Sequence, residues 1–149
     1  MDVTLRKAAD GDLEPLVELM RRYYAHDGHA FDADRARSAM KALLEAPGLG
    51  RVWVLEDGGT AIGYLALTLG YSLEIGGRDA FIDELFLQEE YRGRGHGTRI
   101  LEAVIAEAEE LGVQAVHLEV TRGNEAAALY ARLGFEARPH RLMTRRLLR

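Results

Sequence analysis

The chain has 149 residues, no cysteine and a formal net charge of −5 at pH 7, and 48% of its residues are hydrophobic. This length suffices for a core, so we expect one domain over residues 1–149. The lack of cysteine excludes disulfides, thiolate nucleophiles and cysteine-based zinc sites, and the negative charge argues against nucleic-acid binding. Without a signal-peptide core or an apolar run near the roughly 20 residues that span a bilayer, we expect a cytoplasmic protein with no membrane partner.

The first third of the chain is predicted to form one strand and two helices. Val3–Lys7 is typical of a short strand. Asp10 and Asp12 favour the start of a helix, whose apolar face is Leu13, Leu16, Val17, Met20 and Tyr24. A second helix is predicted from Asp32 to the Pro47-Gly48 pair, with Ala36, Met40 and Leu43 facing inward.

The middle third changes to the spacing of strands. Residues 51–56 and 61–69 are rich in β-formers and are joined by Asp57-Gly58-Gly59, a strong hairpin signal. A polar connection over residues 71–78 leads to a further strand at residues 80–87.

The last third begins with a glycine-rich turn, from which apolar residues recur at helical spacing to about Leu111. We expect a strand at residues 113–120, a helix at residues 124–133 that ends at Gly134, and a final strand at Arg141–Leu148. This order of elements predicts a mixed α/β domain.

The turn Tyr91-Arg92-Gly93-Arg94-Gly95-His96-Gly97-Thr98 is the clearest functional motif. A glycine-rich turn that feeds a helix exposes backbone N–H groups at the positive end of the helix dipole, which suits an anion such as a pyrophosphate. A dinucleotide fingerprint fits less well because it follows the first strand, and no Lys-Ser/Thr pair completes a Walker loop. Taken alone, the turn is also compatible with a flexible, solvated loop.

A second motif reads Asn124-Glu125-Ala126-Ala127-Ala128-Leu129-Tyr130-Ala131-Arg132-Leu133-Gly134-Phe135. Together with Arg92-Gly93-Arg94-Gly95-His96-Gly97, it resembles the two signatures of the GNAT family of acyl-CoA N-acyltransferases. The resemblance is strong over residues 81–135 and extends to the remainder by element order. It implies a mixed, mostly antiparallel sheet of about six to seven strands with about four helices, splayed between the fourth and fifth strands.

The resemblance also implies acetyl-CoA as cosubstrate and places its binding residues. The pyrophosphate would lie on the turn, and the pantetheine along the fourth strand, where a backbone N–H near Leu85 or Leu87 would stabilise the oxyanion. The residues implied to bind the cosubstrate are Leu85, Phe86, Leu87, Arg92, Gly93, Arg94, Gly95, His96, Gly97, Thr98, Asn124, Ala127 and Tyr130.

Three residues are candidates for proton transfer. The Tyr130 phenol is the candidate acid for the departing thiolate, although its helical spacing also suits a core residue. Asp83 and Glu84 are neighbours in an apolar strand, so they should point to opposite faces, at least one of them toward a polar cleft. We favour Glu84 as the base, with Asp83 second; pairing of either with an arginine is the structural alternative.

The acceptor side is less defined in the sequence. In the family, the end of the first helix and the segment before the fourth strand commonly form the acceptor pocket. This points to Tyr24, His26, Asp27, Tyr71 and Glu74, whose aromatic and acidic character suits a cationic amine, although each also reads as ordinary surface. The histidines form no ligand spacing, so no metal site is predicted.

We therefore predict an enzyme that moves an acetyl group directly to a primary amine of a small molecule, with no acyl-enzyme. Ile82-Asp83-Glu84-Leu85 somewhat resembles the polyamine/diamine branch of the family, and an amino-acid-like amine is also open. The alternatives are a protein N-terminal or lysine acetyltransferase and a CoA-binding regulatory module without turnover. A homodimer is possible, with Arg141–Leu148 as a plausible participant.

Overall fold

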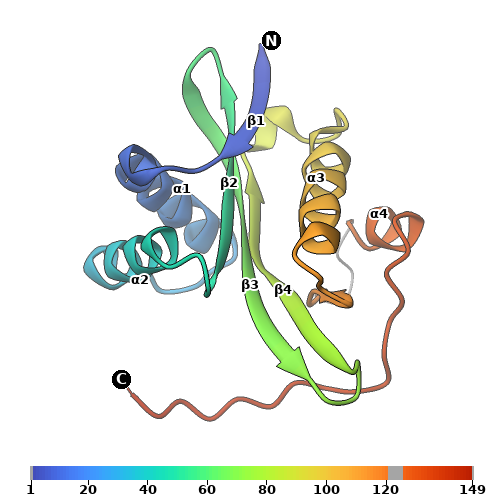
Figure 1. Cartoon of the computed structure of the whole chain (residues 1–149). Coiled ribbons are helices and arrows are strands. Elements are labelled where there is room, and N and C mark those ends of the chain that lie inside the picture. The colour runs from blue at the N-terminus through green and yellow to red at the C-terminus, as the bar shows by residue number, and fades with distance from the viewer. Residues whose placement is uncertain (1, 121–125, 149) are drawn as a thin grey trace. The chain divides into compact units, whose positions relative to one another are not determined.

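A computed structural model describes residues 2–120 and 126–148 of the chain. These residues form two compact units, Met1–Glu119 and Val120–Arg149. The first unit holds the sheet and three α-helices, and the second holds one short helix and an extended C-terminal segment (Figure 1). The single domain over residues 1–149 stays a prediction.

The sheet has five strands in the order β1-β2-β3-β4-β5 among the described residues. They are β1 (Val3–Lys7), β2 (Gly50–Asp57), β3 (Thr60–Ser72), β4 (Gly77–Leu87) and β5 (Ala115–His117). The first four strands pair antiparallel, and β5 pairs parallel to β4. The predicted mixed, mostly antiparallel sheet is confirmed.

Helices cover both faces of this sheet (Figure 1). On one face lie α1 (Leu13–His26), which follows the 3-10 turn η1 (Asp10–Asp12), and α2 (Ala33–Glu45), whose first turn is capped by the Asp32 carboxylate. On the other face lies α3 (His96–Glu110), which follows η2 (Glu89–Tyr91). These helices match the prediction.

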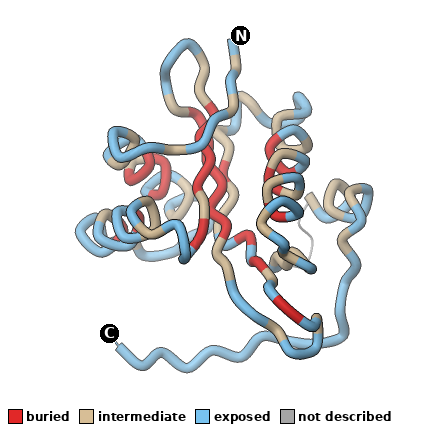
Figure 2. Tube along the Cα trace, in the orientation of Figure 1, coloured by how far each residue is buried: buried red, intermediate tan, exposed pale blue. Residues whose placement is uncertain are grey.

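The core lies between the sheet and its helices, where the buried residues of Figure 2 gather. Leu16, Leu19 and Met20 of α1 and Met40 of α2 pack against Val52, Val54, Tyr64, Ala66 and Phe86 of the strands. On the α3 face, the Arg99 guanidinium donates to the carbonyl of Val3 at 3.0 Å, and Glu107 forms ion pairs with Lys7 and Arg51. The Arg99 contact joins the start of α3 to β1, and the Glu107 ion pairs join its last turn to β1 and β2.

The strands differ from the prediction in length and number. The β3–β4 hairpin is longer than expected, because residues 71–72 and 77–78 of the predicted polar connection, with Gly70 and Asp79 beside them, extend the two strands. The strand predicted at residues 113–120 is limited to Ala115–His117.

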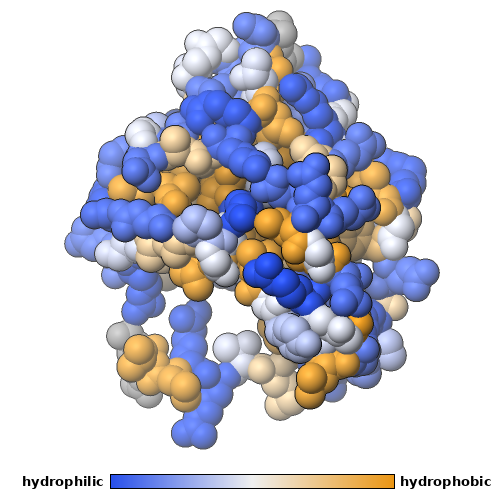
Figure 3. Space-filling model, viewed as in Figure 1, coloured by the Kyte–Doolittle hydropathy of each residue, from blue (hydrophilic) through white to orange (hydrophobic). Residues whose placement is uncertain are grey.

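The final strand predicted at Arg141–Leu148 is wrong. Its apolar residues come in adjacent pairs, Leu142-Met143 and Leu147-Leu148, so a strand would point one member of each pair to either face. These four side chains are 68–93% exposed, and apolar atoms show along the C-terminal segment in Figure 3. The described residues therefore form five strands, where six to seven were expected.

Candidate active site

Strand β4 is irregular at the point where its acidic residues lie. Ala66 of β3 pairs with Glu84 and Leu67 pairs with Ile82, so Asp83 is an extra residue in β4. Such a bulge bends the strand and re-aims its side chains. The prediction that Asp83 and Glu84 point to opposite faces, as neighbours in a regular strand do, is therefore corrected, because both line one hollow.

This hollow has a volume of about 380 Å³ and lies where α1 and α2 meet β3 and β4. Its walls are mostly apolar, and its polar lining is Tyr24, Thr68, Asp83 and Glu84. The apolar lining residues are Met20, Ala39, Met40, Ala42, Leu43, Leu49, Ala66 and Leu69. A small apolar hollow with a few polar groups on one wall is the usual form of a small-molecule site.

Two tyrosine hydroxyls hold the Glu84 carboxylate. Tyr64 of β3 donates to one oxygen at 2.7 Å, and Tyr24 of α1 donates to the other. Tyr23 packs beside both rings, 5.8 Å from Tyr24 and 6.5 Å from Tyr64 between centroids. Glu84 is thus fixed in orientation by groups from a helix and a neighbouring strand.

The surroundings raise the pKa of both acids. For Glu84, burial raises the pKa above the ordinary glutamate value, while the hydrogen bonds from Tyr24 and Tyr64 act in the opposite direction. For Asp83, burial raises the pKa, although part of the residue is open to solvent. A carboxyl group of raised pKa accepts a proton more readily near neutral pH, which suits a general base.

The same environment keeps the two tyrosines protonated. Burial, with the nearby Glu84 charge, raises the pKa of Tyr24 and of Tyr64 well above the ordinary tyrosine value. Both hydroxyls therefore act as donors to Glu84. Within residues 2–120 and 126–148, no arginine or lysine forms an ion pair with Asp83 or Glu84, so the alternative of an arginine partner is not realised there.

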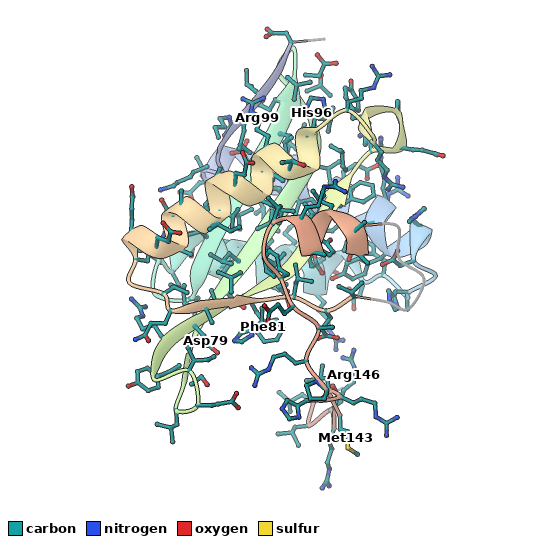
Figure 4. The ribbon with its side chains drawn as sticks, turned by 90° about the vertical axis from the view of Figure 1, so that its right-hand side faces the viewer. Asp79, Phe81, His96, Arg99, Met143 and Arg146 are labelled. Atoms are coloured by element: carbon teal, nitrogen blue, oxygen red, sulfur yellow. The ribbon has the colours of Figure 1, made fainter. Side chains whose placement is uncertain are left out.

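The glycine turn has the geometry of an anion site. Gly93 and Gly95 adopt positive φ angles of 74° and 87°, a conformation that other residues adopt only with strain. The backbone N–H of Arg99 donates the first hydrogen bond within α3, to the carbonyl of Gly95 at 3.1 Å. The N–H groups just before Arg99 thus precede this bond and are open to a ligand. His96 and Arg99 mark this first turn of α3 in Figure 4.

The arginine side chains of the turn fold back on the protein. Arg92 donates to the carbonyl of Leu87 at 2.8 Å and lies over the ring of Phe86. Arg94 donates to the carbonyl of Glu90 at 3.2 Å. Both cations therefore add positive potential around the turn while the backbone provides its donors.

The second half of β4 has one open edge. Leu85, Phe86 and Leu87 pair with β3 through Leu65, Tyr64 and Gly63. On the other side, β5 pairs with β4 only from Asp79 to Phe81 among the described residues; both lie in the first half of β4 in Figure 4. Apart from the Leu87 carbonyl, which accepts from Arg92, the backbone groups on this edge are thus available to a ligand with amides of its own.

The second motif lies in the second unit. Helix α4 spans Ala127–Arg132 and ends before Gly134, whose φ angle is 94°. The ring of Tyr130 packs edge-on against Phe135, with centroids 6.1 Å apart, and burial raises the pKa of its phenol. Tyr130 therefore carries its proton at neutral pH, as an acid must. Asn124 lies outside the described residues.

Of the residues predicted to bind the acceptor, the structure brings Tyr24 to the hollow. His26 and Asp27 lie at the exposed end of α1. Tyr71, which is 70% exposed, and Glu74 lie at the tip of the β3–β4 hairpin. None of these four lines the hollow.

Sequence reasoning missed Tyr64, which is fully buried in β3. A tyrosine inside the apolar run Ile62–Leu67 is itself a signal, because a buried phenol needs a polar partner. That partner is Glu84.

Within the described residues, no cluster of histidine and acidic side chains suits a metal ion. The helices among them are too short or too polar to cross a bilayer.

Comparison with known proteins identifies the chain's relatives. A model of the acetyltransferase (GNAT) family matches residues 13–135, which include the hollow, the glycine turn and α4. This chain belongs to the acetyltransferase (GNAT) family. Membership confirms the family that the sequence predicted.

The chain is 32% identical over 137 residues to an uncharacterized N-acetyltransferase of Methanocaldococcus jannaschii, which matches 89% of this chain and 60% of that relative. The chain thus spans less than two thirds of this relative's length. It is 26% identical over 148 residues to the thialysine N-epsilon-acetyltransferase of Bos taurus, covering 89% of this chain and 83% of that protein.

Among solved structures, an integron cassette protein from the mobile metagenome of Cole Harbour Salt Marsh is similar, with a TM-score of 0.88 and 38% identity. The match covers 97% of this chain and 91% of that chain. This likeness confirms the predicted fold class.

Proposed function

We propose that this GNAT-family chain transfers an acetyl group from acetyl-CoA directly to a primary amine of a small molecule. The observation that carries the proposal is the bulge in β4, which turns Asp83 and Glu84 into one hollow beside the open edge of the strand. A hollow of about 380 Å³ is near the lower end of the roughly 300–1,000 Å³ typical of small-molecule sites. Its size favours a small amine over a peptide.

The donor side of the proposal rests on backbone groups. The N–H groups from Gly93 to Thr98, with the charge of Arg92 and Arg94, suit the pyrophosphate of acetyl-CoA. The open edge from Leu85 to Leu87 suits the amides of the pantetheine arm. We further propose Ala127 and Tyr130 of α4, together with Asn124, as cosubstrate contacts.

Each acid–base group would act at a defined step. Glu84 takes a proton from the ammonium, directly or through a water, and Asp83 holds the cation beside it. The free amine then forms an N–C bond to the thioester carbonyl, and a backbone N–H near Leu85 or Leu87 stabilises the charge on its oxygen. The nitrogen then loses its extra proton to water, the C–S bond breaks, and Tyr130 gives a proton to the departing thiolate and regains one from solvent.

Release of CoA from acetyl-CoA in a panel of primary amines and short peptides tests the proposal. We expect at least one small amine to be consumed, and Tyr130→Phe to lower kcat by about 100-fold with an unchanged Kd for acetyl-CoA. Unchanged turnover in Tyr130→Phe would overturn the role of Tyr130 as the acid. Consumption of peptides alone would favour the peptide acetyltransferase, and acetyl-CoA binding without turnover would favour the regulatory module.

Two further predictions, a cytoplasmic location and a homodimer, stay predictions from the sequence. Arg141–Leu148, the segment expected to take part in a dimer, forms no strand.

A further inference from the structure

The hollow carries charge on one wall only. Its charged lining residues, among those that the structure describes, are Asp83 and Glu84, which are adjacent in β4. The walls from α2 and from the segment before β2 are apolar and include Met40, Leu43 and Leu49. An amine held at the acids therefore places the rest of its body against apolar side chains.

This arrangement disfavours an acceptor with a second cation. The far ammonium of a diamine or polyamine would lose part of its water on entry and meet Met40, Leu43 or the half-exposed Leu49 in place of a carboxylate. Moving an ammonium out of water without a partner is strongly unfavourable. The diamine class predicted from the sequence therefore fits the hollow poorly.

An acceptor with a carboxylate fits poorly as well. No lysine, arginine or histidine is among the described lining residues. The two lining charges are both negative, so they repel an anion. Asp83 and Glu84 would thus attract the amine of an amino-acid-like acceptor and repel its carboxylate.

We infer that the acceptor is a primary monoamine with an apolar body, such as an alkylamine or arylalkylamine. This inference rests on the proposed acetyl transfer and names the substrate class of the same site. The ammonium offsets the repulsion between Asp83 and Glu84, and the body covers apolar wall. Met20 and Met40 adapt to bodies of different shape because their thioether chains are flexible.

A matched pair of amines tests the inference. Hexylamine and 1,5-diaminopentane have the same number of non-hydrogen atoms and differ at the far end, where one carries a methyl and the other an ammonium. We expect kcat/KM for hexylamine to exceed that for 1,5-diaminopentane at least tenfold, and 2-phenylethylamine to exceed lysine likewise. Equal values, or a preference for the diamine, would overturn the inference.

A variant of the apolar wall reverses the preference. Leu49 lines the hollow and is 54% exposed, so it tolerates a polar replacement without opening the core. Leu49→Glu supplies a partner for the far ammonium, and we expect it to raise the ratio of diaminopentane to hexylamine turnover at least tenfold. Leu49→Gln is the neutral control, and Leu73→Glu places the same charge on a residue that is 90% exposed in the hairpin tip. An equal change of the ratio in Leu73→Glu would contradict a selection made in the hollow.

Two measurements separate this inference from the proposed acetyl transfer. One is turnover of both amines with acetyl-CoA, and the other is calorimetric titration of both amines into the protein with CoA. If diaminopentane is acetylated as well as hexylamine, the acceptor inference fails and acetyl transfer stands. If no amine is consumed, acetyl transfer fails. The inference about the hollow then survives only if hexylamine binds at least tenfold more tightly than diaminopentane.

Discussion

The glycine turn and the acid pair are two polar sites that the fold builds in opposite ways. The turn is a run of consecutive residues, Arg92–Thr98, and its donors are backbone N–H groups at the start of α3. The acid pair depends on side chains from α1, β3 and β4 and on one extra residue in a strand. A phosphate site is thus a local structure, whereas the amine site exists only in the folded sheet.

The two sites also differ in what they do to stability. The turn leaves its N–H groups in water until a ligand arrives, so it needs little support from the fold. Asp83 and Glu84 are negative neighbours in an apolar hollow, where burial disfavours the charged form and raises the pKa of each. The comparison suggests that donor binding and acceptor chemistry can be damaged separately.

The largest effect is expected for Glu84→Gln. Loss of the general base should lower kcat by about 10²–10⁴-fold and leave the Kd for acetyl-CoA unchanged, because the glycine turn is intact. Steady-state kinetics and calorimetry measure the two quantities, and Glu102→Gln on exposed α3 surface is the control. A weakened acetyl-CoA affinity in Glu84→Gln would show that the two sites are not independent.

Gly95→Asp changes the proposed acetyl-CoA site and leaves the acid pair intact. A carboxylate beside the pyrophosphate should weaken acetyl-CoA binding by roughly 100-fold, since two charges 4 Å apart near a protein surface repel by a few kcal/mol. Gly95→Ala brings the same strain at a φ of 87° without the charge, so it should weaken binding much less. If acetyl-CoA protects Gly95→Asp against heat as well as wild type, the turn does not bind the pyrophosphate.

A smaller effect is expected for Tyr24→Phe. The Tyr24 hydroxyl lowers the pKa of Glu84 by donating to its carboxylate, so its removal raises that pKa. The acidic limb of the kcat/KM profile should then move to higher pH, since the base must be ionised to act. Tyr64→Phe should move the acidic limb in the same direction. Tyr91→Phe removes a hydroxyl that donates to Asp57 at 2.6 Å, away from Glu84, and should leave the acidic limb unchanged. A shift to lower pH in Tyr24→Phe would contradict Glu84 as the base.

The smallest effect is a gain in stability in Asp83→Asn. Burial raises the folded-state pKa of Asp83 above the ordinary 3.8, so the folded protein binds more protons and loses stability as pH rises through this range. A neutral asparagine avoids that loss, and we expect a higher thermal midpoint than wild type at pH 7 and no advantage at or below pH 3.8. Thermal unfolding at the two pH values measures this, and a lower midpoint at pH 7 would mean that Asp83 stabilises the fold.

Structural features that depend on a few adjacent residues could be predicted from the sequence. The hairpin at Gly58-Gly59, the cap at Asp32 and the turn around Gly93 and Gly95 each depend on a few adjacent residues, and all three occur as expected. The two helices on the first face follow from their 3.6-residue spacing.

What the sequence could not show depends on pairing between distant segments. A bulge at Asp83 is defined only against Ala66 and Leu67 of the neighbouring strand, so strict alternation gave the wrong orientation. The Tyr64–Glu84 hydrogen bond joins residues 20 positions apart. The strand at Arg141–Leu148 failed because its apolar residues come in the adjacent pairs Leu142-Met143 and Leu147-Leu148, which do not give a strand one apolar face.

The open edge of β4 has a consequence for how the protein responds to its donor. A strand that is paired on one side only is a template for one more strand. An extended ligand with amide groups would complete that half of the sheet, in the way that a peptide adds to a sheet edge. The donor would then serve as a removable structural element that completes the sheet during the part of the cycle in which acetyl-CoA is bound.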